Sequence, residues 1–295
     1  MRDRNVELVE RRLKALGFDV TVVNVSPEER RPDLRTSKDG MIMFVEVKTR
    51  VTNHALRRRM ESVAVGDMQS FLVPLDKKNF LSNYVKKANA QLGAAASPAD
   101  FRLLWFREDN DLFVHDFREQ IGTTLLGMRM VAVLRDGGSE RFPCFYAAPA
   151  DFFRYREIDG AMVEQVDGAL TLFLNQFSPR EAAFASSPIC QAIAPAIVDV
   201  RDGDRLGQWY VIDSDVDRKD DDALLSFLRK KYQAVDFLQF TPYASGLSVE
   251  ILKFQTALDS GKSGKYDGFP VLWMLRIFGD SYPASSSTAC ARPAA

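Results

Sequence analysis

Asp33, Glu46 and Lys48 have residue types and a spacing that suit metal-assisted chemistry. Residues 41–49 are rich in apolar and β-branched residues and are expected to form a strand, on which Glu46 and Lys48 share one face. Such charges are costly to bury without a partner. A turn expected at 37–40 would return the chain in an antiparallel hairpin and bring Asp33 beside Glu46. Two adjacent carboxylates can share a divalent cation, and Lys48 can hold a water molecule or a developing negative charge.

The same residues carry a resemblance to a known family. Pro32-Asp33 followed by Glu46-x-Lys48 resembles the signature of the PD-(D/E)XK phosphodiesterases, a superfamily that includes many restriction endonucleases, Holliday-junction resolvases and exonucleases. The core of that family is a helix, three strands, a helix and a strand, with the motif on the second and third strands. For residues 1–107 the resemblance implies an α/β (α+β) fold with a restriction-endonuclease-like αβββαβ core and a mixed sheet.

The resemblance also implies a chemistry for the site. Asp33, Glu46 and the backbone carbonyl of Val47 would bind Mg²⁺ or Mn²⁺, ions that prefer oxygen ligands. The metal would lower the pKa of a bound water and polarise the phosphate, while Lys48 would orient that water or offset negative charge in the transition state. The expected activity is that of a Mg²⁺-dependent deoxyribonuclease, a hydrolase of phosphodiester bonds, and RNA stays open as a substrate.

The elements that must position these residues are expected in the order of the family core. Apolar residues at helical spacing predict a helix over 4–16, and alternating residues predict a strand over 18–25. A second helix is expected over 79–92, and a buried strand over 101–106. The short apolar segment 71–75 is a further candidate strand.

Two further pairs of residues are candidates for the site. Members of the family often carry a glutamate on the first helix that helps the metal site, but here Glu7 and Glu10 flank the apolar stripe without taking its centre. A solvated surface position is the favoured interpretation for both. Some members place a lysine or a glutamine on the second helix, where Lys87 and Gln91 stand one turn apart. The sequence alone does not assign either of them to the site.

Basic residues gather in the half of the chain that carries the motif. Arg57, Arg58 and Arg59 could clamp a nucleic-acid backbone, because arginine forks suit phosphate oxygens, although a solvated helix face is the alternative. Residues 1–107 hold 20 basic and 13 acidic residues, a charge of +7, against 19 and 27 in 108–295, a charge of -8. This division suits a phosphate-binding domain followed by a second domain.

The rest of the chain is less informative. Residues 108–280 are expected to form an α+β extension or domain whose role stays open between specificity, dimerisation and sensing, and 281–295 a disordered tail. A strand is expected at 112–117. Two more are expected at 125–134 and 141–148, and these would pair as a hairpin.

Composition gives bounds on the compartment. The 46% hydrophobic and 27% charged residues are ordinary for a soluble globular protein. The charged residues 1–4 are followed by no apolar run, and no stretch is long and apolar enough to span a membrane, so neither a signal peptide nor a membrane partner is expected. Cys144, Cys190 and Cys290 are far apart and lack metal-site spacing, which makes the reducing cytoplasm the expected location.

We therefore expect a metal-dependent nuclease that acts on DNA. Its appended second domain suggests a role in restriction or in defence against foreign DNA. One alternative is a non-catalytic module that binds nucleic acid or a protein partner on the same fold, and another is an unrelated protein in which the motif is coincidental. Endonuclease or exonuclease action, sequence preference and oligomeric state, a homodimer included, stay open.

Overall fold

The structure is a computed structural model of a mixed α/β protein, and it describes residues 3–23, 31–50, 68–74, 79–108, 114–135, 138–192, 197–233, 237–241, 244–253 and 273–280. The described residues fall into two units. The first lies within Met1–Val51 and Leu75–Tyr243, and the second within Thr52–Pro74 and Ala244–Ala284. None of the helices in the described ranges has the length and apolar character that a membrane crossing requires.

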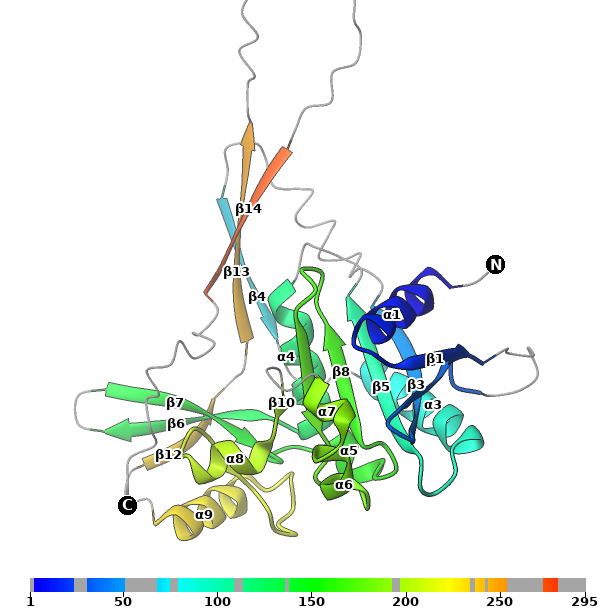
Figure 1. Ribbon diagram of the computed structural model, residues 1–295. Coiled ribbons are helices and arrows are strands. Elements are labelled where there is room, and N and C mark those ends of the chain that lie inside the picture. The colour runs from blue at the N-terminus through cyan, green and yellow to red at the C-terminus, as the bar shows by residue number, and fades with distance from the viewer. Residues whose placement is uncertain are drawn as a thin grey trace, which may run out of the picture. The chain divides into compact units, whose positions relative to one another are not determined.

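A seven-stranded mixed sheet with the order β1-β2-β3-β5-β8-β9-β10 forms the centre of the first unit (Figure 1). β1, β2 and β3 form an antiparallel meander, β3, β5 and β8 are parallel, and β9 runs antiparallel to β8 and parallel to β10. The α/β class and the mixed sheet expected from the sequence are confirmed. The bounds are β1 (Asp19–Val22), β2 (Leu34–Lys38), β3 (Met41–Arg50), β5 (Phe101–Glu108), β8 (Gly160–Glu164), β9 (Leu170–Leu174) and β10 (Ile197–Val198).

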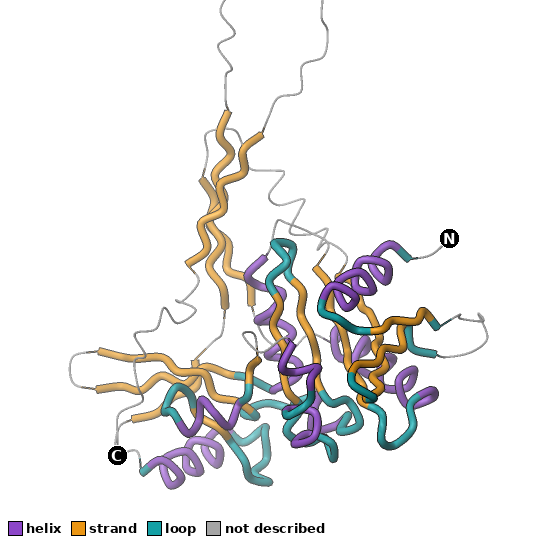
Figure 2. Tube along the Cα trace, in the orientation of Figure 1, coloured by secondary structure: helices purple, strands orange, loops and turns teal. Residues whose placement is uncertain are grey.

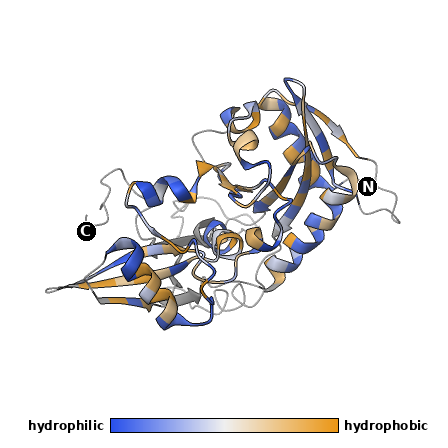
Figure 3. Ribbon diagram, turned by 90° about the horizontal axis from the view of Figure 1, so that it is seen from below, coloured by the Kyte–Doolittle hydropathy of each residue, from blue (hydrophilic) through white to orange (hydrophobic). Residues whose placement is uncertain are grey.

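Amphipathic helices cover both faces of this sheet (Figure 3). On one face, Val9 of α1 lies in a buried cluster with Val45 of β3. On the other face, Val85 of α3 and Ile121 of α4 lie in a second cluster with Phe44 of β3. The helices of the described residues are α1 (Arg4–Ala15), α3 (Asn79–Ala95), α4 (Val114–Leu126), α5 (Asp151–Arg154), α6 (Glu181–Ala185), α7 (Pro188–Ala192), α8 (Val200–Arg205) and α9 (Asp221–Tyr232).

A four-stranded sheet, order β11-β7-β6-β12, extends the first unit. Leu224 and Leu228 of α9 pack on this sheet in a cluster with Val131 and Leu238. Asp220 caps α9 by accepting a hydrogen bond from the backbone N–H of Ala223 at 2.9 Å. The strands are β6 (Arg129–Arg135), β7 (Gly138–Phe145), β11 (Tyr210–Val211) and β12 (Phe237–Thr241).

The second unit is an antiparallel sheet of three strands (Figure 2). Its central strand pairs with both others. One edge strand comes from the first quarter of the sequence, whereas the central strand and the other edge strand come from the last quarter. The strands are β4 (Met68–Pro74), β13 (Ala244–Lys253) and β14 (Trp273–Asp280). The candidate strand expected at 71–75 is therefore a strand, and its partner is distant in sequence, since Pro74 pairs with Ala244.

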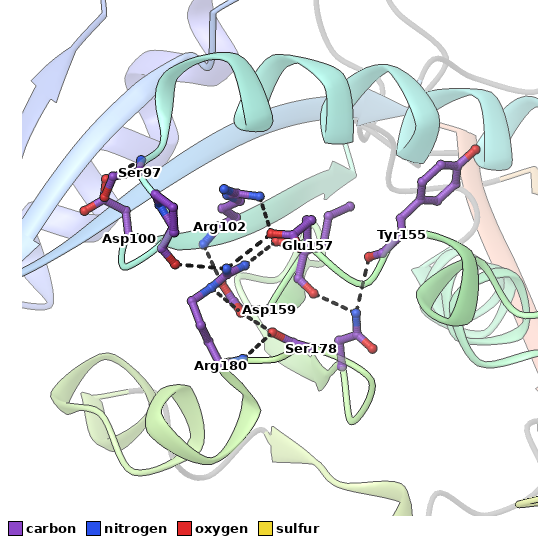
Figure 4. A network of polar contacts seen from close by, with 11 residues as sticks. Ser97, Asp100, Arg102, Tyr155, Glu157, Asp159, Ser178 and Arg180 are labelled. Atoms are coloured by element: carbon purple, nitrogen blue, oxygen red, sulfur yellow. Dashed lines mark hydrogen bonds and ion pairs between the residues drawn. The ribbon is translucent and has the colours of Figure 1, made fainter.

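A network of hydrogen bonds and ion pairs lies at the N-terminal ends of β5 and β8 (Figure 4). The fully buried carboxylate of Asp159 accepts hydrogen bonds from the backbone N–H of Arg102 at 2.7 Å, the hydroxyl of Ser178 at 2.5 Å and Nε of Arg180 at 3.1 Å. Both arginines also reach Glu157, at 2.6 and 3.2 Å. Each oxygen of the buried carboxylate thus has a donor.

Several expected elements are confirmed and one is wrong. The helix expected over 4–16 and the hairpin of β6 and β7 are present. The strand expected at 112–117 is wrong, because residues from Val114 onward form α4. Phe117, Ile121 and Leu125, spaced four residues apart, are buried on one face of that helix. A run of four or five apolar residues fits both strand and helix periodicity, so only the longer repeat along the chain shows that a helix forms.

Strand pairing crosses the boundary expected after residue 107. β5 ends at Glu108 and pairs in parallel with β8, so the sheet that carries the motif continues into the second half of the sequence. The tail expected at 281–295 lies outside the described residues.

Candidate active site

The hairpin of β2 and β3 positions Asp33. Asp39 and Gly40 connect the strands with φ values of 51° and 79°, the conformation that a two-residue hairpin turn requires. This turn sets the register that pairs Leu34 with Val45. Because Asp33 directly precedes Leu34, it lies where the pairing ends, beside the next residues of β3.

The backbone of Val47 holds the Asp33 carboxylate. The N–H of Val47 donates to Oδ2 of Asp33 at 2.8 Å. In a strand, the N–H and C=O of one residue point toward the same neighbour. The pairing of β2 with β3 ends at Val45, so the carbonyl of Val47 lies beyond it and points to the edge where Asp33 lies.

Glu46 is buried with one satisfied and one unsatisfied oxygen. Its side chain is 1% exposed, and Oε1 forms an ion pair with Nζ of Lys48. Within the described part of the chain, Oε2 is buried without a hydrogen-bond partner. A buried carboxylate oxygen without a donor is unusual in a folded protein and calls for a cation or a proton.

Burial and neighbouring charges shift the pKa values of both carboxyl groups of the site. Burial first, and then the charge of Asp33, raise the pKa of Glu46 to about 7, although the ammonium of Lys48 opposes them. Burial also raises the pKa of Asp33, against the N–H of Val47 and the charge of Lys48. Asp33 raises the pKa of Glu46, whereas Glu46 lowers the pKa of Asp33, so the two carboxyl groups interact and are close enough to share a cation.

Gln91 joins the site from α3. Nζ of Lys48 donates to Oε1 of Gln91 at 3.3 Å, and Nε2 of Gln91 donates to the backbone carbonyl of Arg31 at 3.3 Å. Lys87, one turn earlier on the same helix, is exposed. Of the two candidates on this helix, Gln91 is thus the one in contact with the motif lysine.

The packing of the first helix is consistent with the surface position favoured for Glu7 and Glu10. α1 packs on the face of β3 that carries Val45, whereas Glu46 shares the opposite face with Phe44. Glu10 pairs with Lys14 at 2.7 Å along the helix.

Sequence reasoning missed Asp3, whose charge contributes to the raised pKa of Asp33. Asp3 is the N-cap of α1 and accepts a hydrogen bond from the N–H of Asn5 at 2.8 Å. An acidic residue directly before a helix is a recognisable capping signal, and it would have drawn attention to this end of α1 rather than to Glu7.

The donor set fits a hard divalent cation. In the described ranges, no group of three or more His, Cys, Asp and Glu side chains suits a metal. Asp33 and Glu46 bring two carboxylates, and Val47 brings a carbonyl on the same edge. Oxygen-only sets with few protein ligands suit Mg²⁺ and Mn²⁺, which keep several waters. The unpartnered Oε2 of Glu46 is the observation that favours this fit.

Arg57, Arg58 and Arg59, the expected phosphate clamp, lie outside the described residues.

Comparisons with protein-family models, with curated proteins and with solved structures return no significant match. The interpretation of the site therefore depends on its own geometry.

Proposed function

We propose that this chain is a metal-dependent nuclease that hydrolyses phosphodiester bonds of DNA at the site of Asp33, Glu46 and Lys48. The observation that carries the proposal is the buried Oε2 of Glu46, which has no donor in the described residues and lies beside a second carboxylate. A pair of charges kept for stability alone would be expected to have both oxygens satisfied.

The arrangement of elements supports the same proposal. α1, the meander of β1 to β3, α3 and β5 follow the order of the PD-(D/E)XK core that the motif resembles. Asp33 precedes the second strand and Glu46 and Lys48 lie on the third, as in that family's pattern. β3 and β5 are parallel, and the motif lies in the C-terminal half of β3. Ligands of open α/β sheets bind outside the carboxyl ends of the strands.

Each residue then has a role that its contacts allow. A bound Mg²⁺ or Mn²⁺ would supply an activated water and polarise the phosphate. Asp33, held by the N–H of Val47, and Glu46 would bind the cation. Lys48 can donate to a water or to a phosphate oxygen, since its ammonium has three donors. Gln91 holds that ammonium and limits its movement.

Cleavage assays test the proposal. Supercoiled plasmid and linear duplex DNA are incubated with the protein and Mg²⁺, Mn²⁺ or a chelator. We expect cutting that needs the metal, and a fall of about 10²–10³-fold in rate for Asp33→Asn and for Lys48→Ala, because each removes an interaction with developing charge or with the cation.

Matched controls separate the site from general effects. Asp39→Asn changes an acid in the hairpin turn, where asparagine also accepts a positive φ. Lys86→Ala removes an exposed lysine from α3. Both should cut at the unmodified rate. Cutting that survives Asp33→Asn and Lys48→Ala would refute the proposed site, and binding of DNA without any cutting would favour the non-catalytic module.

A further inference from the structure

An exposed aromatic ring lies on α3, on the same side of the helix as Gln91. Phe80 is 45% exposed, and Tyr84 follows it one turn later. Phe80, Tyr84 and Gln91 are separated by four and seven residues, a spacing that places them on one side of an α-helix. The two rings therefore extend a line of side chains that begins at the candidate active site.

This side of α3 faces the strand that follows Asp33. Nε2 of Gln91 donates to the carbonyl of Arg31, shortly before β2, and Oε1 of Gln91 accepts from Lys48 at 3.3 Å. Successive residues of a helix lie about 100° apart, so the residue after each ring turns into the core, where Leu81 is buried. At 1.5 Å per residue, Phe80 lies about 16 Å along the helix from Gln91.

Tyr84 supports the ring of Phe80 from one side. The two rings lie edge to face, with centroids 6.1 Å apart and planes at 84°. Tyr84 is partly buried against the core cluster that contains Val85. A perpendicular pair covers only one face of one ring, so at least one face of Phe80 is not used by Tyr84. Within the described part of the chain, no lysine or arginine lies over the Phe80 ring.

The charges near this side of α3 suit phosphate groups. The helix contains no Asp or Glu from Asn79 to Ala95. Arg35 of β2 pairs with Phe44, so it lies on the sheet face of Glu46, and it is exposed there. A nucleic-acid strand with a phosphate at Lys48 would therefore meet a cation on β2 and no carboxylate along α3.

We propose that Phe80 stacks on an unpaired base of a DNA strand whose scissile phosphate lies at Asp33, Glu46 and Lys48. An exposed aromatic ring can stack on any base, because every base has a π-face. Bases inside a duplex are already stacked and paired, and exposing one costs a few kcal/mol. The distance from Gln91 to Phe80 spans at most about five nucleotides at 3.4 Å each.

This inference rests on the proposed nuclease function and adds a substrate class to it. The substrate would be a single strand, or a duplex with a single-stranded end that reaches Phe80. Stacking on a supported ring needs little ordering of the protein, because Tyr84 already restricts the ring.

Binding is measured by fluorescence anisotropy with the full chain and a chelator, so that no metal-dependent cleavage interferes. The probes are a labelled strand of twelve thymidines and a labelled blunt duplex of twelve base pairs. We expect Phe80→Ala to weaken binding of the strand about 10-fold, the value of one stacked base, and to leave the affinity for the duplex unchanged.

Three further variants separate stacking from other effects. Phe80→Leu keeps an apolar side chain without a π-face and should weaken strand binding as Phe80→Ala does, whereas Phe80→Trp should retain it. Because Phe80 is exposed, its variants should keep the melting temperature of the unmodified protein. Phe153→Ala is the matched control, since Phe153 of α5 is a phenylalanine that is 53% exposed and lies outside α3. It should bind the strand like the unmodified protein.

Equal affinities of Phe80→Ala and the unmodified protein for the strand would overturn the proposal. So would an equal loss of affinity for the duplex, full affinity in Phe80→Leu, or no binding of the strand at about 0.1 mM, the weak limit of non-specific binding. Metal-dependent cutting by a protein whose strand affinity does not depend on Phe80 would remove this inference and leave the nuclease. Binding that depends on Phe80 without any cutting would support the stacking site and remove the nuclease.

Discussion

Glu46 and Asp159 are both buried carboxylates of one sheet, but only one of them has all its hydrogen bonds. Asp159 is 0% exposed, and donors from Arg102, Ser178 and Arg180 reach its two oxygens (Figure 4). Glu46 is 1% exposed, and among the described residues only one of its oxygens has a partner. Satisfied buried charge is typical of a structural role, whereas unsatisfied buried charge is typical of a site that awaits a ligand.

Asp159 and Glu46 also differ in their positions along the strands. Asp159 binds the backbone at Arg102, near the N-terminal end of β5, and directly precedes β8. Glu46 lies beside Leu104 in the register of β3 with β5, farther toward the C-terminal ends of the parallel strands. One end of the sheet is thus closed by ion pairs, and the other carries the candidate chemistry, as expected for open α/β sheets.

The largest expected effect is a difference in stability between conservative substitutions at the two buried carboxylates. Asp159→Asn should lower the free energy of unfolding by about 3 kcal/mol, because it removes the fully buried counter-charge of Arg180 and leaves that arginine only the exposed carboxylate of Glu157 at 3.2 Å. Glu46→Gln should leave that free energy unchanged or raise it, because it removes a buried charge beside Asp33. Urea unfolding followed by circular dichroism measures both.

Activity should show the opposite order. Folded Asp159→Asn should cleave DNA at the unmodified rate, and Glu46→Gln should lose about 10²–10³-fold. A Glu46→Gln variant that is strongly destabilised and still cleaves would remove the distinction between the two carboxylates.

A smaller effect concerns the position of Lys48. Gln91→Ala removes the amide that contacts Nζ of Lys48, and we expect cleavage to fall about 10-fold, because one positioning hydrogen bond to a charged group is lost. Lys87→Ala, one turn away on the same helix and exposed, is the matched control. Equal rates for Gln91→Ala and Lys87→Ala would contradict a positioning role.

The smallest effect extends the comparison to an exposed carboxylate. Hydrogen bonds from Arg129, at 2.5 and 2.9 Å, lower the pKa of Asp221 at the start of α9. A lowered pKa adds stability above the unfolded value of 3.8, and this stability disappears as the pH falls through the folded value. Because Asp221 is exposed and screened, Asp221→Asn should cost less than about 1 kcal/mol at pH 7. The cost of Asp221→Asn should be smaller at pH 2.5 than at pH 7; a cost that is the same at both would contradict the pairing.

Local sequence signals were sufficient for the hairpin that carries the motif. An apolar, β-branched run marked β3, and the segment 37–40 marked the turn, although Ser37 and Lys38 belong to β2, so an antiparallel hairpin that brings Asp33 beside Glu46 could be expected. The same argument failed for Val114–Phe117, where a short apolar run fits both periods and burial against the sheet selects a helix.

The remaining features depend on contacts between distant segments. No local pattern brings Gln91 to Lys48, 43 residues away, because the packing of α3 on β3 determines that contact. The Asp159 network joins Arg102 to a residue 57 positions later. The unsatisfied oxygen of Glu46 is likewise a property of the whole surrounding structure, and composition or spacing cannot reveal it.

The most direct test of the central claim is a titration of the metal-free protein with Mn²⁺, in which electron paramagnetic resonance counts the free ion. Unmodified protein and Glu46→Gln are compared, with Asp159→Asn as the second buried carboxylate. We predict saturable binding at the site of Glu46, weakened at least about 100-fold in Glu46→Gln and unchanged in folded Asp159→Asn. The same Mn²⁺ affinity in Glu46→Gln and the unmodified protein, or no binding to either, would contradict the account.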